Sequence, residues 1–158
     1  MKIRAVPVTV WEEVDLLEKT LLASLASLPA PVQEPALTLT KAGGKRLRPM
    51  LLLLTAKFGN YSLPQLEPAM VAVELVHLAS LIHDDILDAA PVRRGVATIN
   101  SNYGPNFAFQ VGNCLFGLAF KLLSGYSMEV IQPLAEAAKY LSFGEWEQKN
   151  SLKQKQTV

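Results

Sequence analysis

Three aspartates within a long apolar segment constrain this chain more than any other feature. The apolar spacing over residues 66–89 predicts one helix, and Asp84 and Asp88 share a face of it because they lie four positions apart, with Asp85 about a quarter-turn away. Clustered carboxylates repel one another and are costly to bury, so a cation is expected among them. Their hard oxygens suit Mg²⁺ that bridges to a diphosphate. The alternative is a solvated helix end, because Pro91 stops the helix just downstream.

Two basic loops lie before and after this helix in the sequence. The first follows the pair Gly43-Gly44 and precedes a helix expected from about Pro49, and the second follows Pro91. A flexible glycine pair, cations and the free N–H groups of a helix N-terminus favour an anion site, and the alternative for each cluster alone is a charged loop. A nucleic-acid surface is not expected, because the formal net charge of the chain is only +1. The cations are Lys45, Arg46, Arg48, Arg93 and Arg94.

The rest of the chain also has the pattern of helices, so the expected fold class is all-α. A helix is expected from a capping box at Thr9 to about Leu28, and the prolines between residues 29 and 35 are expected to break it. No alternating strand pattern occurs. The length predicts one domain over residues 1–158. Further helices are expected over residues 49–59, 66–89 and 106–123 and from 133 past 146, with a polar tail at 149–158.

The composition is apolar for a chain of this size. Hydrophobic residues make up 50% of the sequence and charged residues 18%, so an exposed apolar face that serves as an interface is expected. No stretch reaches the roughly 18 consecutive apolar residues that a membrane-spanning helix needs, and the N-terminus has no secretory hydrophobic segment. The lone Cys114 excludes an internal disulfide and is compatible with a cytoplasmic location.

The motifs occur in an order that resembles one family closely. The chain reads G-G-K-R-L-R-P over residues 43–49, E-L-V-H-L-A-S-L-I-H-D-D-I-L-D over residues 74–88 and R-R-G over residues 93–95. This order and spacing resemble the trans-isoprenyl diphosphate synthases, or polyprenyl synthetases, and G-E-W-E-Q at 144–148 resembles their G-E-x-x-Q segment. The resemblance implies the N-terminal half of the isoprenoid-synthase helical bundle and a prenyltransferase activity.

The resemblance also implies a role for each matching residue. Asp84 and Asp88 would hold Mg²⁺ against an allylic diphosphate, and Asp85 would support them as a further ligand or by contacting the ligands. The allylic diphosphate would then leave, and the double bond of isopentenyl diphosphate would attack the resulting carbocation. Arg93 would bind the allylic diphosphate, and the diphosphate of isopentenyl diphosphate would be bound by Lys45, Arg48, His77 and Arg94.

Four further positions near these motifs carry expectations. His77 shares the helix face of Asp84, about two turns before it, although a lone histidine on an apolar helix is more often a core residue. Arg46 matches the family motif but receives no role, and a solvated cation is expected there. In short-chain members of the family a bulky aromatic residue stands four or five positions before the first aspartate. The small residues Ser80 and Ala79 at those positions imply an open tunnel and a medium or long product.

Members of this family carry a second Asp-rich motif and a Lys-Thr pair in a second half, and neither occurs in this sequence. The main hypothesis is therefore a catalytic subunit of a split prenyltransferase, active only in a hetero-oligomer with a complementary chain that supplies the second motif. The alternatives are a non-catalytic subunit that shapes the tunnel or regulates a synthase, and a fragment of a full-length synthase. A terpene cyclase would share the Asp-rich motif but not the basic G-G-K-R-L-R-P segment.

Overall fold

The computed structural model describes the backbone of residues 8–155 and confirms the all-α fold class. Over these residues the chain forms seven helices and one two-stranded antiparallel sheet. It divides into two compact units, Met1–Ser124 and Gly125–Val158, so a single domain over the whole chain stays a prediction. The elements of the first unit are α1 (Val8–Ala26), α2 (Ala30–Lys41), α3 (Leu47–Ala56), α4 (Leu63–Leu87), β1 (Val92–Arg93), β2 (Val96–Ala97), α5 (Ile99–Tyr103) and α6 (Pro105–Leu123).

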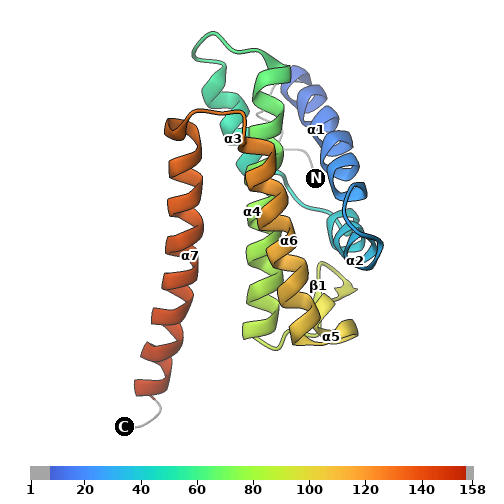
Figure 1. Ribbon diagram of the computed structural model, residues 1–158, viewed down its shortest axis with the longest axis vertical. Helices are drawn as coiled ribbons and strands as arrows, with labels where there is room; N and C mark the ends of the chain where they lie inside the picture. The colour runs from blue at the N-terminus through green and yellow to red at the C-terminus, as the bar shows by residue number, and fades with distance from the viewer. Residues whose placement is uncertain (1–7, 156–158) are drawn as a thin grey trace. The chain divides into compact units, whose positions relative to one another are not determined.

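Helix α4 is the centre of the first unit. It runs antiparallel to α6, against which it packs most extensively, and it also contacts α1 and α3 (Figure 1). Because neighbours cover α4 on several sides, its buried residues are not confined to one stripe, and the four consecutive residues 69–72 are all buried. The large, fully buried apolar side chains of this core are Val10, Leu17, Leu21, Leu25, Leu53, Met70, Leu75, Leu78, Ile82, Leu115 and Leu123.

A glycine on α6 allows a close approach to the C-terminal part of α4. A Cβ atom at Gly112 would fall 2.6 Å from Cδ2 of His83, a distance that real Cβ atoms do not show. The His83 ring also stacks on Phe109, with 5.1 Å between ring centroids, and lies 5.8 Å from the ring of Phe116. The segment of α4 that carries the three aspartates is therefore held against α6 by ring packing.

The expected break at the prolines is present, because α1 ends at Ala26, but the segment after it forms a further helix, α2, that the sequence did not predict. Pro29 stands just before α2, and Pro31 lies in its first turn, where a missing N–H removes no helical hydrogen bond. Pro35 lies inside α2 and is buried, so its ring gains apolar contacts that offset the missing hydrogen bond. The prediction that Thr9 begins the first helix with a capping box was wrong, because Val8 is already helical.

Two small elements between α4 and α6 were not anticipated. The strands β1 and β2 are two residues each, too short to show an alternating pattern, and they pair Val92 with Ala97 and Arg93 with Val96. Helix α5 is only five residues long, and the hydroxyl of Thr98 caps it by accepting a hydrogen bond from the Ser101 N–H at 3.0 Å.

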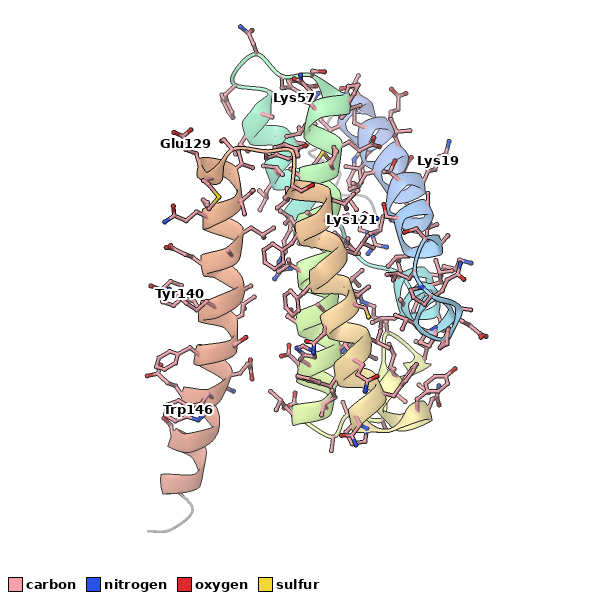
Figure 2. The ribbon with its side chains drawn as sticks, viewed as in Figure 1. Lys19, Lys57, Lys121, Glu129, Tyr140 and Trp146 are labelled. Carbon is pink, nitrogen blue, oxygen red and sulfur yellow. The ribbon has the colours of Figure 1, made fainter. Side chains whose placement is uncertain are left out.

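The second unit contains one helix, α7 (Met128–Lys155), among its described residues. It begins before Pro133, the expected start, and continues through most of the segment expected as a polar tail. Tyr140 and Trp146 both project from α7 (Figure 2) and are 63% and 61% exposed, which agrees with the expectation of exposed apolar surface. None of the described helices combines the length and the apolar character needed to cross a membrane.

Candidate functional site

Four of the predicted site residues meet at one cavity of the first unit, which has a volume of about 270 Å³. Lys45 and Arg48 come from the segment around the start of α3, His77 from α4 and Arg94 from the β hairpin. Three cations at one cavity suit an anion with several negative charges. The other residues that line it are Gly44, Arg46, Leu47 and Glu74.

The backbone before α3 explains how Lys45 and Arg48 reach this cavity. Gly43 has a φ of 101°, a conformation that side chains disfavour, and Arg46 itself is left-handed with a φ of 48°. Arg46 is the N-cap of α3, so the first N–H groups of the helix lie in the same segment as Lys45 and Arg48. Pro49 is buried in this first turn, where its missing N–H is tolerated.

Arg46 is not the solvated cation that the sequence suggested. Its side chain is only 6% exposed, and its Nε and Nη2 donate to the two carboxylate oxygens of Glu18 at 2.7 and 2.8 Å. Nη1 donates to Glu74 at 2.8 Å, and Nη2 also donates to the carbonyl of Thr40 at 3.1 Å. Burial alone would lower the pKa of the guanidinium, but the two carboxylates outweigh it and raise the pKa.

A tight hairpin turn separates the two neighbouring arginines. Arg93 and Val96 are paired, so Arg94 and Gly95 form a two-residue loop, and both have a positive φ, 52° and 81°. This is the pattern of a type I′ turn, which accommodates glycine easily and other residues less readily. Across this turn, Arg93 donates to Asp85 whereas Arg94 lines the cavity.

Arg94 has a guanidinium nitrogen, Nη1, that is buried and makes no hydrogen bond among the described residues. Burial lowers the pKa of Arg94, and the nearby Arg46 and Arg93 lower it further, while Glu74 acts in the opposite direction. Gly44 permits this crowding, because a Cβ there would lie 2.7 Å from Nη1 of Arg46 and 3.1 Å from Nη1 of Arg94. A buried cationic donor without a partner at a cavity is well suited to an incoming anion.

The cations around the cavity make His77 a weak base. Its pKa is lowered from 6.5 to about 4. Burial is the largest cause, and the positive charges of Arg48, Arg94, Arg46 and Arg93 contribute in decreasing order. His77 is therefore neutral at pH 7 and can offer one ring N–H to an anion without adding a charge.

The three aspartates differ in their surroundings. Asp85 is 2% exposed and accepts a hydrogen bond from Nε of Arg93 at 2.6 Å. Burial raises the pKa of Asp85 and Asp88 adds to this, whereas Arg93 opposes it. Asp84 is half-buried, and Asp88, the C-cap of α4, is exposed. Asp85 is thus hydrogen-bonded to Arg93 of the hairpin. Asp84 and Asp88, one helical turn apart, remain as the two carboxylates that could share a metal ion.

The donor set of Asp84 and Asp88 fits a Mg²⁺ ion that is shared with a ligand. Carboxylate oxygens are among the ligands that Mg²⁺ prefers, and the exposed position of Asp88 leaves room for the waters and phosphate oxygens that would be its other ligands. In the described part of the chain, no group of three or more His, Cys, Asp and Glu side chains is arranged so that it could hold a metal ion. Two carboxylates therefore suit a cation whose other ligands come from water and substrate.

The two residues assigned to product length lie elsewhere on α4. Ala79 is fully buried in the core, and Ser80 is half-buried with its hydroxyl donating to the carbonyl of His77 at 2.8 Å. Neither residue lines the cavity that Lys45, Arg48, His77 and Arg94 line. Their part in chain length stays a prediction.

This arrangement has close relatives among known proteins. The family model described as Polyprenyl synthetase matches residues 29–158. The chain belongs to the polyprenyl synthetase family. It is 39% identical over 124 residues to heptaprenyl diphosphate synthase component 2 of Geobacillus stearothermophilus, a match that covers 78% of this chain and 39% of that protein. Prenyl diphosphate synthases generally use Mg²⁺.

Solved structures of polyprenyl synthetases and related enzymes share the fold. The geranylgeranyl pyrophosphate synthase of Lactobacillus brevis aligns with a TM-score of 0.84 and 34% identity over 90% of this chain and 45% of that chain. A decaprenyl diphosphate synthase of Rhodobacter capsulatus aligns with a TM-score of 0.80 and 34% identity over 87% of this chain and 43% of that chain. The present chain thus spans less than half the length of these relatives.

One family segment lies in the second unit. Residues 144–148, which read G-E-W-E-Q, are part of α7, and Trp146 there packs against Phe143 with 5.8 Å between ring centroids. Gly144, Glu145 and Gln148 line a shallow hollow along the same helix.

Proposed function

We propose that this chain is a prenyltransferase subunit that condenses isopentenyl diphosphate with an allylic diphosphate. The observation that carries the proposal is the convergence of Lys45, Arg48, His77 and Arg94 on one cavity. These residues come from three separate segments and supply cationic and neutral donors to a single anion. The Asp-rich end of α4 lies on the same helix as His77 and supplies the second group of charged residues.

In this proposal the two groups bind two different diphosphates. The cavity residues hold isopentenyl diphosphate, and the buried Nη1 of Arg94 donates to one of its phosphate oxygens. Asp84 and Asp88 would hold Mg²⁺, which would supply charge stabilisation for the leaving diphosphate of the allylic substrate. We assign Arg93, whose Nε donates a hydrogen bond to Asp85, to the same leaving group.

The reaction follows from this charge layout. The allylic C–O bond breaks and the diphosphate leaves with the electron pair, so the allyl group becomes a carbocation. The double bond of isopentenyl diphosphate then forms the new C–C bond, and a proton is lost to regenerate an alkene. The departing diphosphate is the proposed proton acceptor, because His77, whose pKa is lowered to about 4, is a weak base.

The second part of the proposal concerns a partner. Relatives of this chain include heptaprenyl diphosphate synthase component 2 of two bacteria, and a protein so named is one part of a larger enzyme. We propose that a complementary chain supplies the second Asp-rich motif and the Lys-Thr pair. The hetero-oligomer would then make a medium- or long-chain product. The small residues at 79 and 80 support that product length.

The test is purification of the chain from its native source, identification of the protein that co-elutes, and assay of radiolabelled isopentenyl diphosphate incorporation. We expect no incorporation by the chain alone and Mg²⁺-dependent incorporation by the complex. Asp84→Ala or Asp88→Ala should abolish turnover while assembly persists, since each removes a proposed Mg²⁺ ligand. A complex that elongates normally with both substitutions would assign this chain a regulatory or tunnel-shaping part, and a complex without prenyltransferase activity would overturn the proposal.

A further inference from the structure

The most unusual side chain near the cavity is one that the proposed chemistry does not use. Arg46 is buried and left-handed, a combination that costs free energy both in desolvation and in backbone conformation. Four hydrogen bonds offset this cost, and they reach α1 through Glu18, α4 through Glu74 and the end of α2 through the carbonyl of Thr40. Arg46 therefore ties the segment before α3 to three helices at once.

The bond to Glu18 is the most specific of these contacts. Both carboxylate oxygens accept, one from Nε and one from Nη2, which is the forked geometry that an arginine and a carboxylate form. Glu18 does not line the cavity, whereas Lys45 and Arg48, on either side of Arg46, do. Glu18 can therefore influence a bound anion either through its contacts with Arg46 or through its charge alone.

We infer that Glu18 is a positioning residue for the anion site, acting through Arg46 to fix the backbone that carries Lys45 and Arg48. The inference rests on the proposed function, because it assumes that the cavity binds a diphosphate. The fork holds Arg46 in its left-handed conformation, and that conformation sets the direction of the neighbouring side chains. Glu74 supports the same arrangement, because it is a counter-charge to Arg46 and also acts on Arg94 beside Gly44.

Two explanations of Glu18 make opposite predictions for the variant Glu18→Gln. If Glu18 acted only by its charge, removing a negative charge near a cation-lined cavity would strengthen the binding of an anion. If it acts by position, binding weakens, because an amide has one acceptor oxygen and its NH₂ group opposes the second arm of Arg46. The sign of the change in affinity therefore separates the two.

The experiment is isothermal titration calorimetry of inorganic diphosphate into the 158-residue chain in Mg²⁺-free buffer at 25 °C. Glu18→Gln should weaken binding about tenfold, the effect of losing one charge-assisted hydrogen bond at the site. The matched control is Glu13→Gln, the same change on the same helix, where Glu13 pairs with Lys57 at 2.7 Å. Lys57 is the C-cap of α3 and Arg46 is its N-cap, so they lie about 15 Å apart along the helix. The control should therefore bind diphosphate within twofold of wild type.

Melting temperatures are measured for the same proteins, because a purely structural role would lower the melting temperature of Glu18→Gln without changing its affinity at 25 °C. That result, or tighter binding, would overturn the inference and leave the proposed function intact. If Glu18→Gln does not fold, Arg46→Lys serves instead: it keeps the charge but cannot form the fork, and it should also bind more weakly. A wild-type chain that does not bind diphosphate would overturn the proposed anion site itself, and the inference with it.

Discussion

Diphosphate binding should raise the pKa of His77. In the free protein this pKa is about 4, because the imidazole is partly buried and faces several arginines, with Arg48 and Arg94 the foremost. The difference from the ordinary value of 6.5 corresponds to at most about 3 kcal/mol between the two protonation states. An anion in the cavity cancels the contribution of the arginines but not that of burial, so the pKa should rise to roughly 5–6.

The assay is an NMR titration of the imidazole resonances in the full chain, without and with saturating inorganic diphosphate. The sequence contains two histidines, so the variant His77→Gln assigns the signal and leaves that of His83 in place. By linkage, a pKa that rises on binding means that protons are taken up, so affinity should increase as the pH falls through this range. The same variant serves as the control for protonation of diphosphate itself, because that contribution persists when the imidazole is removed.

The low pKa of His77 also makes the stability of the free protein depend on pH. The unfolded chain takes up a proton on this histidine below about 6.5, whereas the folded chain does so only below about 4. The free energy of unfolding should therefore fall as the pH drops from 6.5 to 4, by up to about 3 kcal/mol, and His77→Gln should flatten that part of the curve. A pKa near 6.5 in the free protein, or one that does not move while calorimetry shows diphosphate bound, would refute the placement of His77 at the anion site.

Three further substitutions test the packing of α4 and its part in product length. Gly112→Ala should lower the melting temperature, at a cost of about 1–3 kcal/mol, because its methyl group overlaps the ring of His83, whereas Gly117→Ala on the same helix meets nothing within 4 Å and should not. In the reconstituted enzyme, Ser80→Phe should shorten the main product without stopping the first condensation, and an unchanged product distribution under excess isopentenyl diphosphate would place the length control elsewhere. Ala79→Tyr should instead destabilise the fold, because residue 79 is fully buried, and thermal unfolding of the variant checks this.

The parts of the fold that the sequence predicted are those fixed by local patterns. The long helix α4, the helix α6 and the start of α3 follow from apolar spacing and from glycine and proline signals within a few residues. Helix α2 was missed because its three prolines are read locally as breaks. Two of them occupy positions before the helix and in its first turn, and the third is buried by tertiary contacts that a local pattern does not contain.

The sequence predicted which residues line the cavity, but it did not predict the contacts that hold them in place. Lys45, Arg48, His77 and Arg94 stood out by motif, and they line one cavity. Arg46 stands in the same motif and has the same chemistry, yet its partners Glu18 and Glu74 lie 28 residues before and 28 residues after it. No feature of the neighbouring sequence distinguishes a buried arginine from a solvated one, because the difference depends on which carboxylates the fold brings near.

The adjacent arginines of the hairpin, Arg93 and Arg94, lie in different surroundings: Arg93 contacts Asp85 and Arg94 lines the cavity. In an extended strand, neighbouring side chains already point to opposite faces, and the positive φ values of Arg94 and Gly95 reverse the chain directly after Arg93. Arg93 consequently neutralises the buried Asp85 beside the carboxylate pair, while Arg94 carries an unpartnered donor to the cavity. Both arginines therefore belong to one two-residue turn and its flanking strands, although their side chains serve different places. The ion pair between Asp85 and Arg93 thus joins the Asp-rich end of α4 to the hairpin that carries Arg94.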